Sequence, residues 1–311
     1  LSLIIFMFGL LITGLSLKFG FINSRNSDPN ISKLYTANQD WKYPDGLIKK
    51  TKNGADLYIL EGGNKITLMF GDSHMQHYSP RATFLKDNAE INTIYWVTGG
   101  CLPVPFIKRY HQSGNCENIQ QLFLDLLKLP DVEKVVISNF WIDYFKQVKP
   151  VDINHLKDGD LFISDPILGV FGLNDEESKA RTMHAISSYL SNITKGKKAY
   201  IILDNPTGEE YSPMYFLDGI RLKNLHVNNE IPKKIKINHD QKLFIDKFTK
   251  LAVPASWTAI NPWSVLCDDT MCSLLDDNFN FIYKDNNHLR SSWVSQHATY
   301  IDQTILQERH N

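Results

Sequence analysis

The sequence has no surplus of charge of either sign and none of the common metal-binding spacings. Its 33 Lys and Arg residues balance 34 Asp and Glu residues, for a formal net charge of −1. Proteins that bind nucleic acid usually present a basic surface, so this composition argues against such a partner. The 10 His residues are dispersed, with no His-x-x-x-His or Cys-x-x-Cys spacing. We therefore predict no metal site and no cofactor in this domain.

The start of the chain also lacks the features of a secretory signal peptide, since it has no initiator Met, no basic start and no small-x-small cleavage site. Instead, residues 1–17 carry no charged side chain, and Lys18 is the first. An apolar run of about 17–22 residues suits a membrane-spanning helix. We expect residues 1–22 to be the last transmembrane helix of a longer protein. The alternative, a buried helix, is disfavoured because polar residues mark no face of it.

Cysteine is scarce, with four residues in two pairs that are close in sequence. Of the three pairings that four cysteines allow, the local one predicts disulfides Cys101–Cys116 and Cys267–Cys272. Free buried thiols are the alternative and would suit a cytosolic protein. Beside a membrane anchor we prefer disulfides, which persist in oxidising compartments, and we expect this part of the chain to face the periplasm or the cell exterior.

Most of the chain alternates short apolar runs with helical patterns, which predicts one doubly wound, parallel α/β sheet. The hydrophobic residues make up 43% of the 311 residues, enough for one large core. We expect five strands, at residues 66–70, 92–97, 134–138, 199–203 and 257–260. The main helices are expected at residues 75–86, 117–129, 175–195 and 291–307. Residues 207–254 are polar and rich in lysine, and we expect them to form an irregular insertion near the active face.

The first candidate site residue is Ser73, in the stretch Gly71-Asp72-Ser73-His74. The apolar run before Gly71 predicts a buried strand, and helical character follows, so Ser73 is expected at the exposed end of a strand. Acyl transfer needs both an accessible nucleophile and N–H donors for the oxyanion, and this position offers both. Alone, Gly-Asp-Ser is a weak signal, because the same residues serve as a turn with a helix N-cap.

The second candidate is Asp285-Asn-Asn-His288, close to the other end of the chain. An Asp and a His three residues apart on one turn can act as a unit. The carboxylate orients one imidazole nitrogen, and the other nitrogen takes the proton of a serine. Ser73, Asp285 and His288 are therefore our candidate catalytic residues.

Gly-Asp-Ser followed by a C-terminal Asp-x-x-His resembles the SGNH hydrolase superfamily. In particular, it resembles the SGNH domains fused behind acyltransferase-3 membrane domains. The resemblance implies a flavodoxin-like three-layer α/β/α domain over residues 65–311, preceded by a periplasmic extension at residues 23–64. It also implies that Ser73 is the nucleophile, with His288 as base and Asp285 as its orienter.

The same resemblance implies an oxyanion hole made by the backbone of Ser73, by a glycine after the second strand and by an Asn after the third. Gly99 and Gly100 compete for the glycine, and we favour Gly100. Asn139 stands in the third position, but the usual Gly-x-Asn-Asp pattern is replaced by Ser-Asn-Phe-Trp. Gly99, His74 and Trp141 are further expected to line the pocket.

What the resemblance implies for function is an O-acyltransferase, most simply an O-acetyltransferase, that works through an acyl-serine. The acceptor would be a hydroxyl of a bacterial cell-surface polysaccharide such as lipopolysaccharide O-antigen. The expected partners are this polysaccharide, the inner membrane and an upstream acyltransferase-3 domain that uses acyl-CoA as donor. Two alternatives stay open: a glycan O-acetylesterase with the same triad, and a non-catalytic domain that only positions the glycan.

Overall fold

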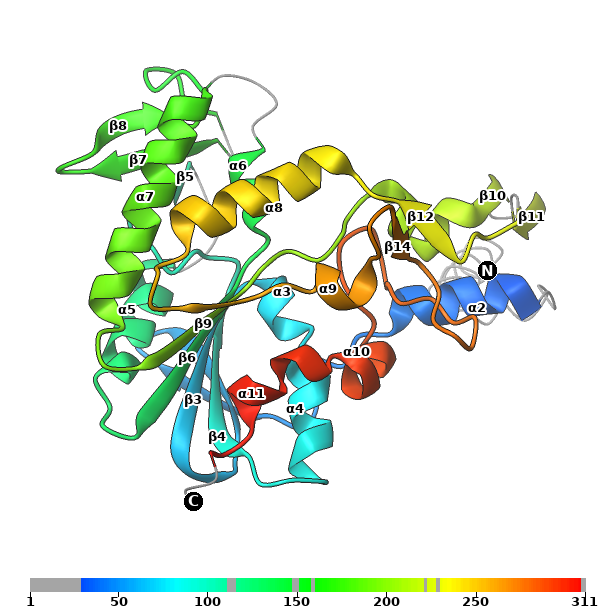
Figure 1. The fold of residues 1–311 in the computed structure, drawn as a ribbon, viewed down its shortest axis with the longest axis horizontal. Coiled ribbons are helices and arrows are strands. Elements are labelled where there is room, and N and C mark those ends of the chain that lie inside the picture. Colours follow the sequence, from blue (N-terminus) through cyan, green and yellow to red (C-terminus); the bar gives the residue numbers. More distant parts are fainter. Residues whose placement is uncertain are drawn as a thin grey trace, which may run out of the picture.

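A computed structural model describes residues 29–110, 116–146, 151–157, 160–220, 223–227 and 230–308. Figure 1 shows one central sheet, with helices on both of its faces and further segments beyond its carboxyl edge. The expected membrane helix over residues 1–22 lies outside the described residues. Within the described ranges, no helix is long and apolar enough to cross a bilayer.

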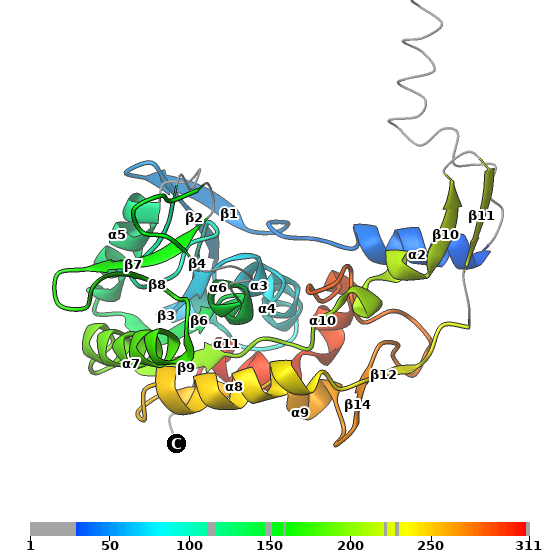
Figure 2. The ribbon, with the colours of Figure 1, turned by 90° about the horizontal axis from the view of Figure 1, so that it is seen from above.

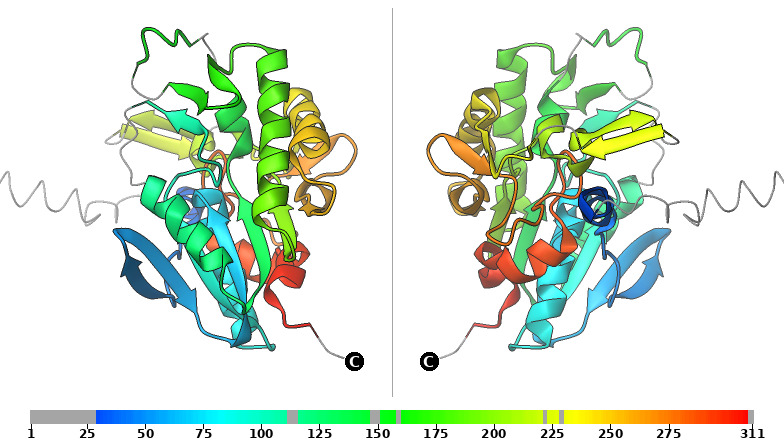
Figure 3. Two further views of the ribbon diagram at one scale, coloured as in Figure 1. Left: turned by 90° about the vertical axis from the view of Figure 1, so that its left-hand side faces the viewer. Right: turned by 90° about the vertical axis from the view of Figure 1, so that its right-hand side faces the viewer.

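The central sheet has seven strands in the described chain, in the order β1-β2-β4-β3-β6-β9-β13. They are β1 (Ile48–Lys52), β2 (Ala55–Leu60), β3 (Gly63–Gly71), β4 (Asn92–Thr98), β6 (Val132–Ser138), β9 (Lys198–Ile202) and β13 (Thr258–Ile260). The five strands from β4 to β13 run parallel, and they are the five that the sequence predicts. The predicted number of strands is wrong, because β2 and β1 add an antiparallel hairpin at one edge of the sheet (Figure 3).

The two added strands come from the segment expected to be a periplasmic extension. Buried and half-buried residues alternate along most of β2, with Ala55, Leu57 and Ile59 buried. This strand pairs directly with β4. This segment also contains α2 (Pro29–Gln39), whose Ile31, Leu34 and Ala37 are buried. The extension is therefore integrated with the main domain by backbone hydrogen bonds and by its own apolar contacts.

Helices cover both faces of the sheet (Figure 2). One face carries α5 (Cys116–Leu127) and α7 (Glu176–Ile193), and the other carries α4 (Ser79–Lys86), α10 (Ser291–His297) and α11 (Asp302–Ile305). The helix α7 begins with a capping box, in which Asp175 accepts from the backbone N–H of Ser178. This cap fixes the start of α7 at the beginning of the helix expected over residues 175–195.

Two of the predicted helices are divided. The expected helix at 75–86 is split into α3 (Ser73–Gln76) and α4, which has Pro80 in its first turn. Proline has no N–H and clashes with the preceding turn, so it starts a new helix. The expected helix at 291–307 is split into α10, the short helix η4 (Thr299–Ile301) and α11. Ser291 is the first residue of α10, and Arg290 takes the cap position.

The expectation of an irregular insertion over residues 207–254 is wrong in its second half, which forms α8 (His239–Ala252). Asn238 caps this helix by accepting from the N–H of Gln241. Its buried residues Gln241, Ile245, Phe248 and Ala252 lie four, three and four positions apart, the spacing of one helix face. The helix packs against α7 and α6 (Trp141–Phe145) above the carboxyl edge of the sheet (Figure 1).

The remaining elements form three small sheets and their connections. The first small sheet consists of β5 (Ile107–Arg109), β7 (Leu161–Asp165) and β8 (Gly169–Gly172). The second consists of β10 (Leu217–Ile220) and β11 (Lys223–Val227), and the third of β12 (Lys234–Lys236) and β14 (Met271–Ser273). The short helices η2 (Glu209–Tyr211) and η3 (Pro213–Phe216) lie between β9 and β10, and α9 (Trp263–Leu266) lies between β13 and β14.

Candidate active site

The parallel strands bring the predicted site residues to one edge of the sheet. Gly71 at the end of β3 lies opposite Thr98 of β4 and Ser138 of β6. The residues that follow each strand therefore meet at the carboxyl edge, where ligands of open α/β sheets bind. A side chain at position 71 is impossible, because its Cβ would lie 1.8 Å from the carbonyl oxygen of Ser138.

The turn that carries Ser73 is held by Asp72. One carboxylate oxygen of Asp72 accepts the N–H of His74 at 2.8 Å, and the other accepts the N–H of Phe140 at 2.8 Å. Asp72 therefore ties the turn after β3 to the turn after β6. Burial raises the pKa of Asp72, and these hydrogen bonds oppose that rise.

Ser73, His288 and Asp285 lie together at this edge. The Oγ atom of Ser73 is 2.7 Å from Nε2 of His288. On the other side of the ring, Nδ1 is 3.0 Å and 2.9 Å from the two carboxylate oxygens of Asp285. A carboxylate can only accept, so Nδ1 carries the proton and Nε2 is the free acceptor that faces the serine.

The segment from Lys284 to Ser292, a loop followed by the first two residues of α10, holds this geometry, and we call it the His288 loop. Asp285 Oδ1 accepts the backbone N–H groups of Asn287 and His288, and the N–H of Lys284 donates to the carbonyl of His288. Burial raises the pKa of Asp285, but the hydrogen bonds that it accepts from the His288 ring and from the backbone N–H groups of Asn287 and His288 outweigh this and hold the pKa well below its usual range. Asp285 is therefore ionised at neutral pH and able to orient the imidazole.

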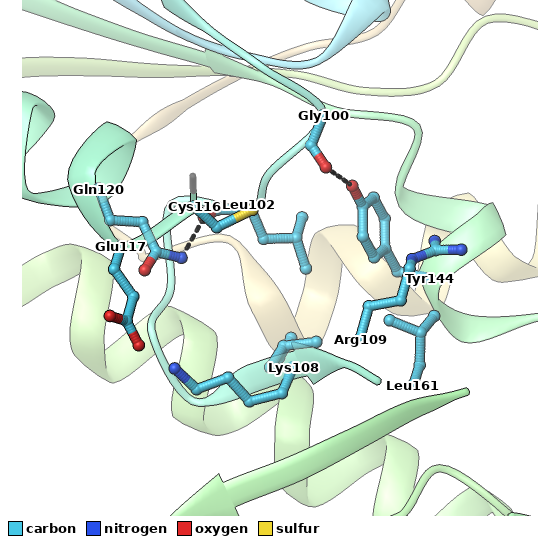
Figure 4. Close-up of a pocket in the computed structure, with 10 residues that line it drawn as sticks. Gly100, Leu102, Lys108, Arg109, Cys116, Glu117, Gln120, Tyr144 and Leu161 are labelled. Atoms are coloured by element: carbon cyan, nitrogen blue, oxygen red, sulfur yellow. Dashed lines mark hydrogen bonds between the residues drawn. The ribbon is translucent and has the colours of Figure 1, made fainter. Parts of the chain in front are cut away.

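The two glycines after β4 differ in what they require. Gly100 has a φ of +71°, a left-handed conformation that favours glycine, and its carbonyl accepts the Tyr144 hydroxyl at 3.3 Å. Figure 4 shows this contact on the wall of a pocket of about 240 Å³, next to Arg109. Gly99 is constrained by packing instead, since its Cβ would lie 2.4 Å from Cδ1 of Ile119. Gly100 as the oxyanion glycine stays a prediction.

Asn139 is completely buried after β6. Its amide nitrogen donates to the carbonyl of Cys101 at 3.1 Å, while its Oδ1 has no hydrogen-bond partner among the described residues. Asn139 thus joins the turn after β6 to the loop after β4, directly beside Gly100. Its predicted role as an oxyanion donor stays a prediction.

Two residues expected to line a pocket lie in the packing beneath the site. His74 is 2% exposed, and its ring stacks on Phe140 with centroids 4.5 Å apart. Trp141 is 0% exposed and packs on Phe248 at 4.8 Å. His77 is also buried, with its ring 5.4 Å from His74. Burial holds the pKa of both His74 and His77 well below the usual value, so both are neutral.

Asp204, which follows β9, supports the site although its sequence context predicted no role for it. Its carboxylate is 1% exposed and accepts the N–H groups of Trp141 and Ile142 at 2.9 and 2.8 Å. Burial raises its pKa well above the usual value, and these two hydrogen bonds oppose that rise. Asp204 therefore anchors the first turn of α6 behind Asn139. The sequence did contain a signal for this role, because Asp204 directly follows the buried strand predicted at residues 199–203.

Both predicted disulfides are present, between Cys101 and Cys116 and between Cys267 and Cys272. The first one begins next to Gly100 and ties that loop to the start of α5.

A groove of about 700 Å³ also adjoins the His288 loop, lined by α6, α8 and the residues Asn286 and Asn287. Across the described ranges, no group of three or more His, Cys, Asp or Glu residues is placed to hold a metal ion.

The fold and the site together define a three-layer α/β protein with a Ser–His–Asp arrangement at the carboxyl edge of its sheet. Residues 42–298 match the model of the family described as the SGNH domain fused to AT3 domains. The chain therefore belongs to this family.

Two solved structures resemble this chain at low sequence identity. One is the periplasmic domain of the lipopolysaccharide acetyltransferase of Salmonella ser. Paratyphi A, with 13% identity, 78% of this chain and 84% of that chain covered, and a TM-score of 0.45. The other has 11% identity, covers 78% of this chain and 97% of its own, and has a TM-score of 0.39. No match was found among curated proteins.

Proposed function

We propose that this domain transfers acyl groups through an acyl-serine on Ser73. The observation that carries the proposal is the 2.7 Å contact between Ser73 Oγ and His288 Nε2, with Asp285 on the opposite ring nitrogen. A nucleophile, a base within hydrogen-bond reach and a group that orients the base are the parts that covalent acyl transfer needs. A domain that only binds a glycan needs none of them in this order.

In the first step, His288 Nε2 takes the proton of Ser73 while Oγ attacks the carbonyl carbon of an activated acyl ester or thioester. The developing oxyanion is held by backbone N–H groups of Ser73 and Gly100. The tetrahedral intermediate then expels the donor alcohol or thiol, which leaves with the proton from His288. The product of this half-reaction is the Ser73 ester, with His288 neutral again.

In the second step, the hydroxyl of an acceptor gives its proton to His288 and attacks the ester carbonyl. Collapse of the intermediate returns that proton to Ser73 Oγ and releases the acylated acceptor. The proposed acceptor is a sugar hydroxyl of a cell-surface polysaccharide such as O-antigen, and acetyl is the simplest acyl group. The family's association with AT3 domains supports delivery of the acyl group by a membrane partner that uses acyl-CoA.

The two disulfides support a location outside the cytoplasm. We propose that residues 1–22 anchor the domain at the inner membrane, with the domain in the periplasm or outside the cell. A glycan O-acetylesterase is the second candidate, since water can replace the acceptor at the same triad.

The experiment compares glycans from cells that carry the full-length protein as wild type, as Ser73→Ala or as the control Ser264→Ala. Ser264 is exposed and its hydroxyl donates to the carbonyl of Asn261. The proposal expects O-acylated glycan with wild type and control and none with Ser73→Ala. Undiminished acylation with Ser73→Ala would reject Ser73 as nucleophile. A glycan that gains acyl groups when Ser73 is lost would identify the esterase instead.

A further inference from the structure

The segment of residues 38–42, which covers the last two residues of α2 and the turn after it, lies against the His288 loop, although about 250 positions separate them. The Trp41 ring meets the His288 imidazole edge-on, with centroids 5.3 Å apart and planes at 77°. The ammonium group of Lys284 lies 5.5 Å from the centre of the same indole ring. The imidazole that faces Ser73 is therefore in contact with a residue that precedes every strand of the central sheet in the sequence.

Hydrogen bonds fix this segment to both ends of the His288 loop. Before the histidine, the side-chain amide of Asn38 donates to the carbonyl of Lys284 at 3.1 Å. After it, the N–H of Ser291 donates to the carbonyl of Asp40 at 3.3 Å, and the N–H of Lys42 donates to the hydroxyl of Ser291 at 2.8 Å. The contacts thus bracket Asp285 and His288.

An ion pair reinforces the same junction. The guanidinium of Arg290, two residues after His288, donates to Asp40 Oδ2 at 3.0 Å, and the N–H of Ser292 donates to the same oxygen. The side chains of Arg290 and Asp40 are only 13% and 11% exposed. A charge-assisted bond at such a buried place is stronger and less screened by salt than a surface pair.

We propose that residues 38–42 are a positioning element of the active site. Asp40 fixes the path of the His288 loop, and Trp41 restricts the imidazole from one side while His74, with its ring centroid 5.1 Å away, lies against another part of it. The inference rests on the proposed function for the roles of Ser73 and His288. Because a displacement of about 1 Å can slow a reaction about 100-fold, a loosened imidazole costs rate even in a folded protein.

The first test removes the ion pair with Asp40→Asn and uses Asp302→Asn as a matched control. Asp302 also pairs with an arginine, Arg81, in a partly buried bidentate contact, but that pair joins α4 to α11. The measured quantity is the rate at which a fluorophosphonate ester labels Ser73 in the full chain. We expect Asp40→Asn to slow labelling about 10- to 100-fold, and Asp302→Asn to lower the melting temperature while labelling stays within about twofold of wild type.

The second test separates positioning by Trp41 from a general loss of stability. Trp41→Ala is expected to slow labelling as Asp40→Asn does, and Trp41→Phe, which keeps an aromatic edge, is expected to restore most of the rate. Equal rates for wild type and Trp41→Ala would overturn the role of Trp41. Equal slowing by Asp40→Asn and Asp302→Asn would overturn the role of Asp40.

A readout that needs no reaction keeps the inference distinct from the proposed function. The proton on Nδ1 of His288, which is hydrogen-bonded to Asp285, is expected to give a downfield NMR resonance. We expect Asp40→Asn and Trp41→Ala to shift or broaden it, and Asp302→Asn to leave it in place. If wild type is not labelled, the proposed function fails, and this resonance still decides the inference. A resonance unmoved by both Asp40→Asn and Trp41→Ala overturns it.

Discussion

Nε2 of His288 lies 2.7 Å from Oγ of Ser73, across a sequence separation of 215 residues. Neither residue is in regular sheet structure: Ser73 begins a short helix after β3, and His288 stands on a loop before α10. Their contact depends on two turns that are each fixed by a buried or half-buried aspartate, Asp72 and Asp285. Proton transfer from Ser73, and with it the proposed acyl transfer, depends on this contact.

Changes in the histidine–aspartate pair should slow the reaction without unfolding the protein. In Asp285→Asn, the amide can donate to Nδ1, which favours the tautomer with the proton on Nε2, facing Ser73. We expect labelling of Ser73 by a fluorophosphonate to fall by about 10³- to 10⁴-fold. His288→Gln should fall at least as far, because the base is lost. Rates within about tenfold of wild type for both variants would contradict the assigned roles.

The Asp204 carboxylate should matter more for stability than its exposed neighbour Asp143. Asp204→Ala leaves the N–H groups of Trp141 and Ile142 unpaired in a buried place, so we expect a loss of about 2–4 kcal/mol in the free energy of unfolding. Asp143 is exposed and lies 3.5 Å from Arg109, so Asp143→Ala should cost less than about 1 kcal/mol. Urea denaturation measures both, and equal losses would refute the anchoring role of Asp204.

The first disulfide should stabilise the fold and the loop that carries Gly100. Cys101 and Cys116 are separated by 15 residues, and closing a loop of that size contributes about 3 kcal/mol. The shorter Cys267–Cys272 loop should contribute about 2 kcal/mol. Melting curves of the two double Cys→Ser variants test this order. We expect the loss of Cys101–Cys116, but not of Cys267–Cys272, to slow the labelling of Ser73 as well. Equal labelling rates in both variants would show that the position of Gly100 held by Cys101–Cys116 does not affect the reaction of Ser73.

The buried histidines should make stability depend on pH. Burial lowers the folded-state pKa of His74 and His77, where the facing groups are His288, Asp285 and each other. Unfolded histidine titrates near a pKa of about 6.5, so below that pH the unfolded chain takes up protons that the folded chain refuses. Stability is then lost as pH falls, with a limiting slope of about 1.4 kcal/mol per pH unit for each histidine.

His77→Phe tests this directly, because neither ring nitrogen of His77 has a hydrogen-bond partner within the described part of the chain. The variant should gain stability relative to wild type when the pH is lowered from about 8 to about 5, since it has one buried histidine fewer to protonate on unfolding. Urea titrations at the two pH values measure the change. An unaltered pH slope in the variant would show that His77 takes a proton in the folded state.

The sequence predicted those features that depend on local pattern and order. The five parallel strands are mostly apolar runs, and Ser73 follows one of them, so its place at the carboxyl edge could be predicted. Asp285 and His288 were predictable as a pair because they lie three positions apart on one turn. The disulfides were predictable because their partners are near neighbours in sequence. These features need no knowledge of distant packing.

What the sequence did not reveal depends on contacts between distant segments. The hairpin β1–β2 turns at Asn53 and Gly54, which both have a positive φ, and this Asn-Gly pair is a hairpin signal that the sequence did contain. What the sequence did not reveal is its place in the sheet, which depends on the pairing of β2 with β4. Asp40 and Trp41 lie in the segment expected to be a periplasmic extension, and their contacts with Arg290 and His288 join residues about 250 positions apart. The bond from the Asn139 amide to the carbonyl of Cys101 joins the turns after β6 and β4, and no local pattern predicted it. The spacing of apolar residues in α8 was a missed signal that the sequence did contain.

The most direct test of the central claim is mass spectrometry of the full-length protein after reaction with a fluorophosphonate ester. We expect a single phosphonyl adduct on the peptide that contains Ser73, formed quickly with wild type and at most slowly with His288→Gln. The account would be contradicted by an unmodified Ser73 in folded wild-type protein, or by labelling that proceeds equally fast without the imidazole.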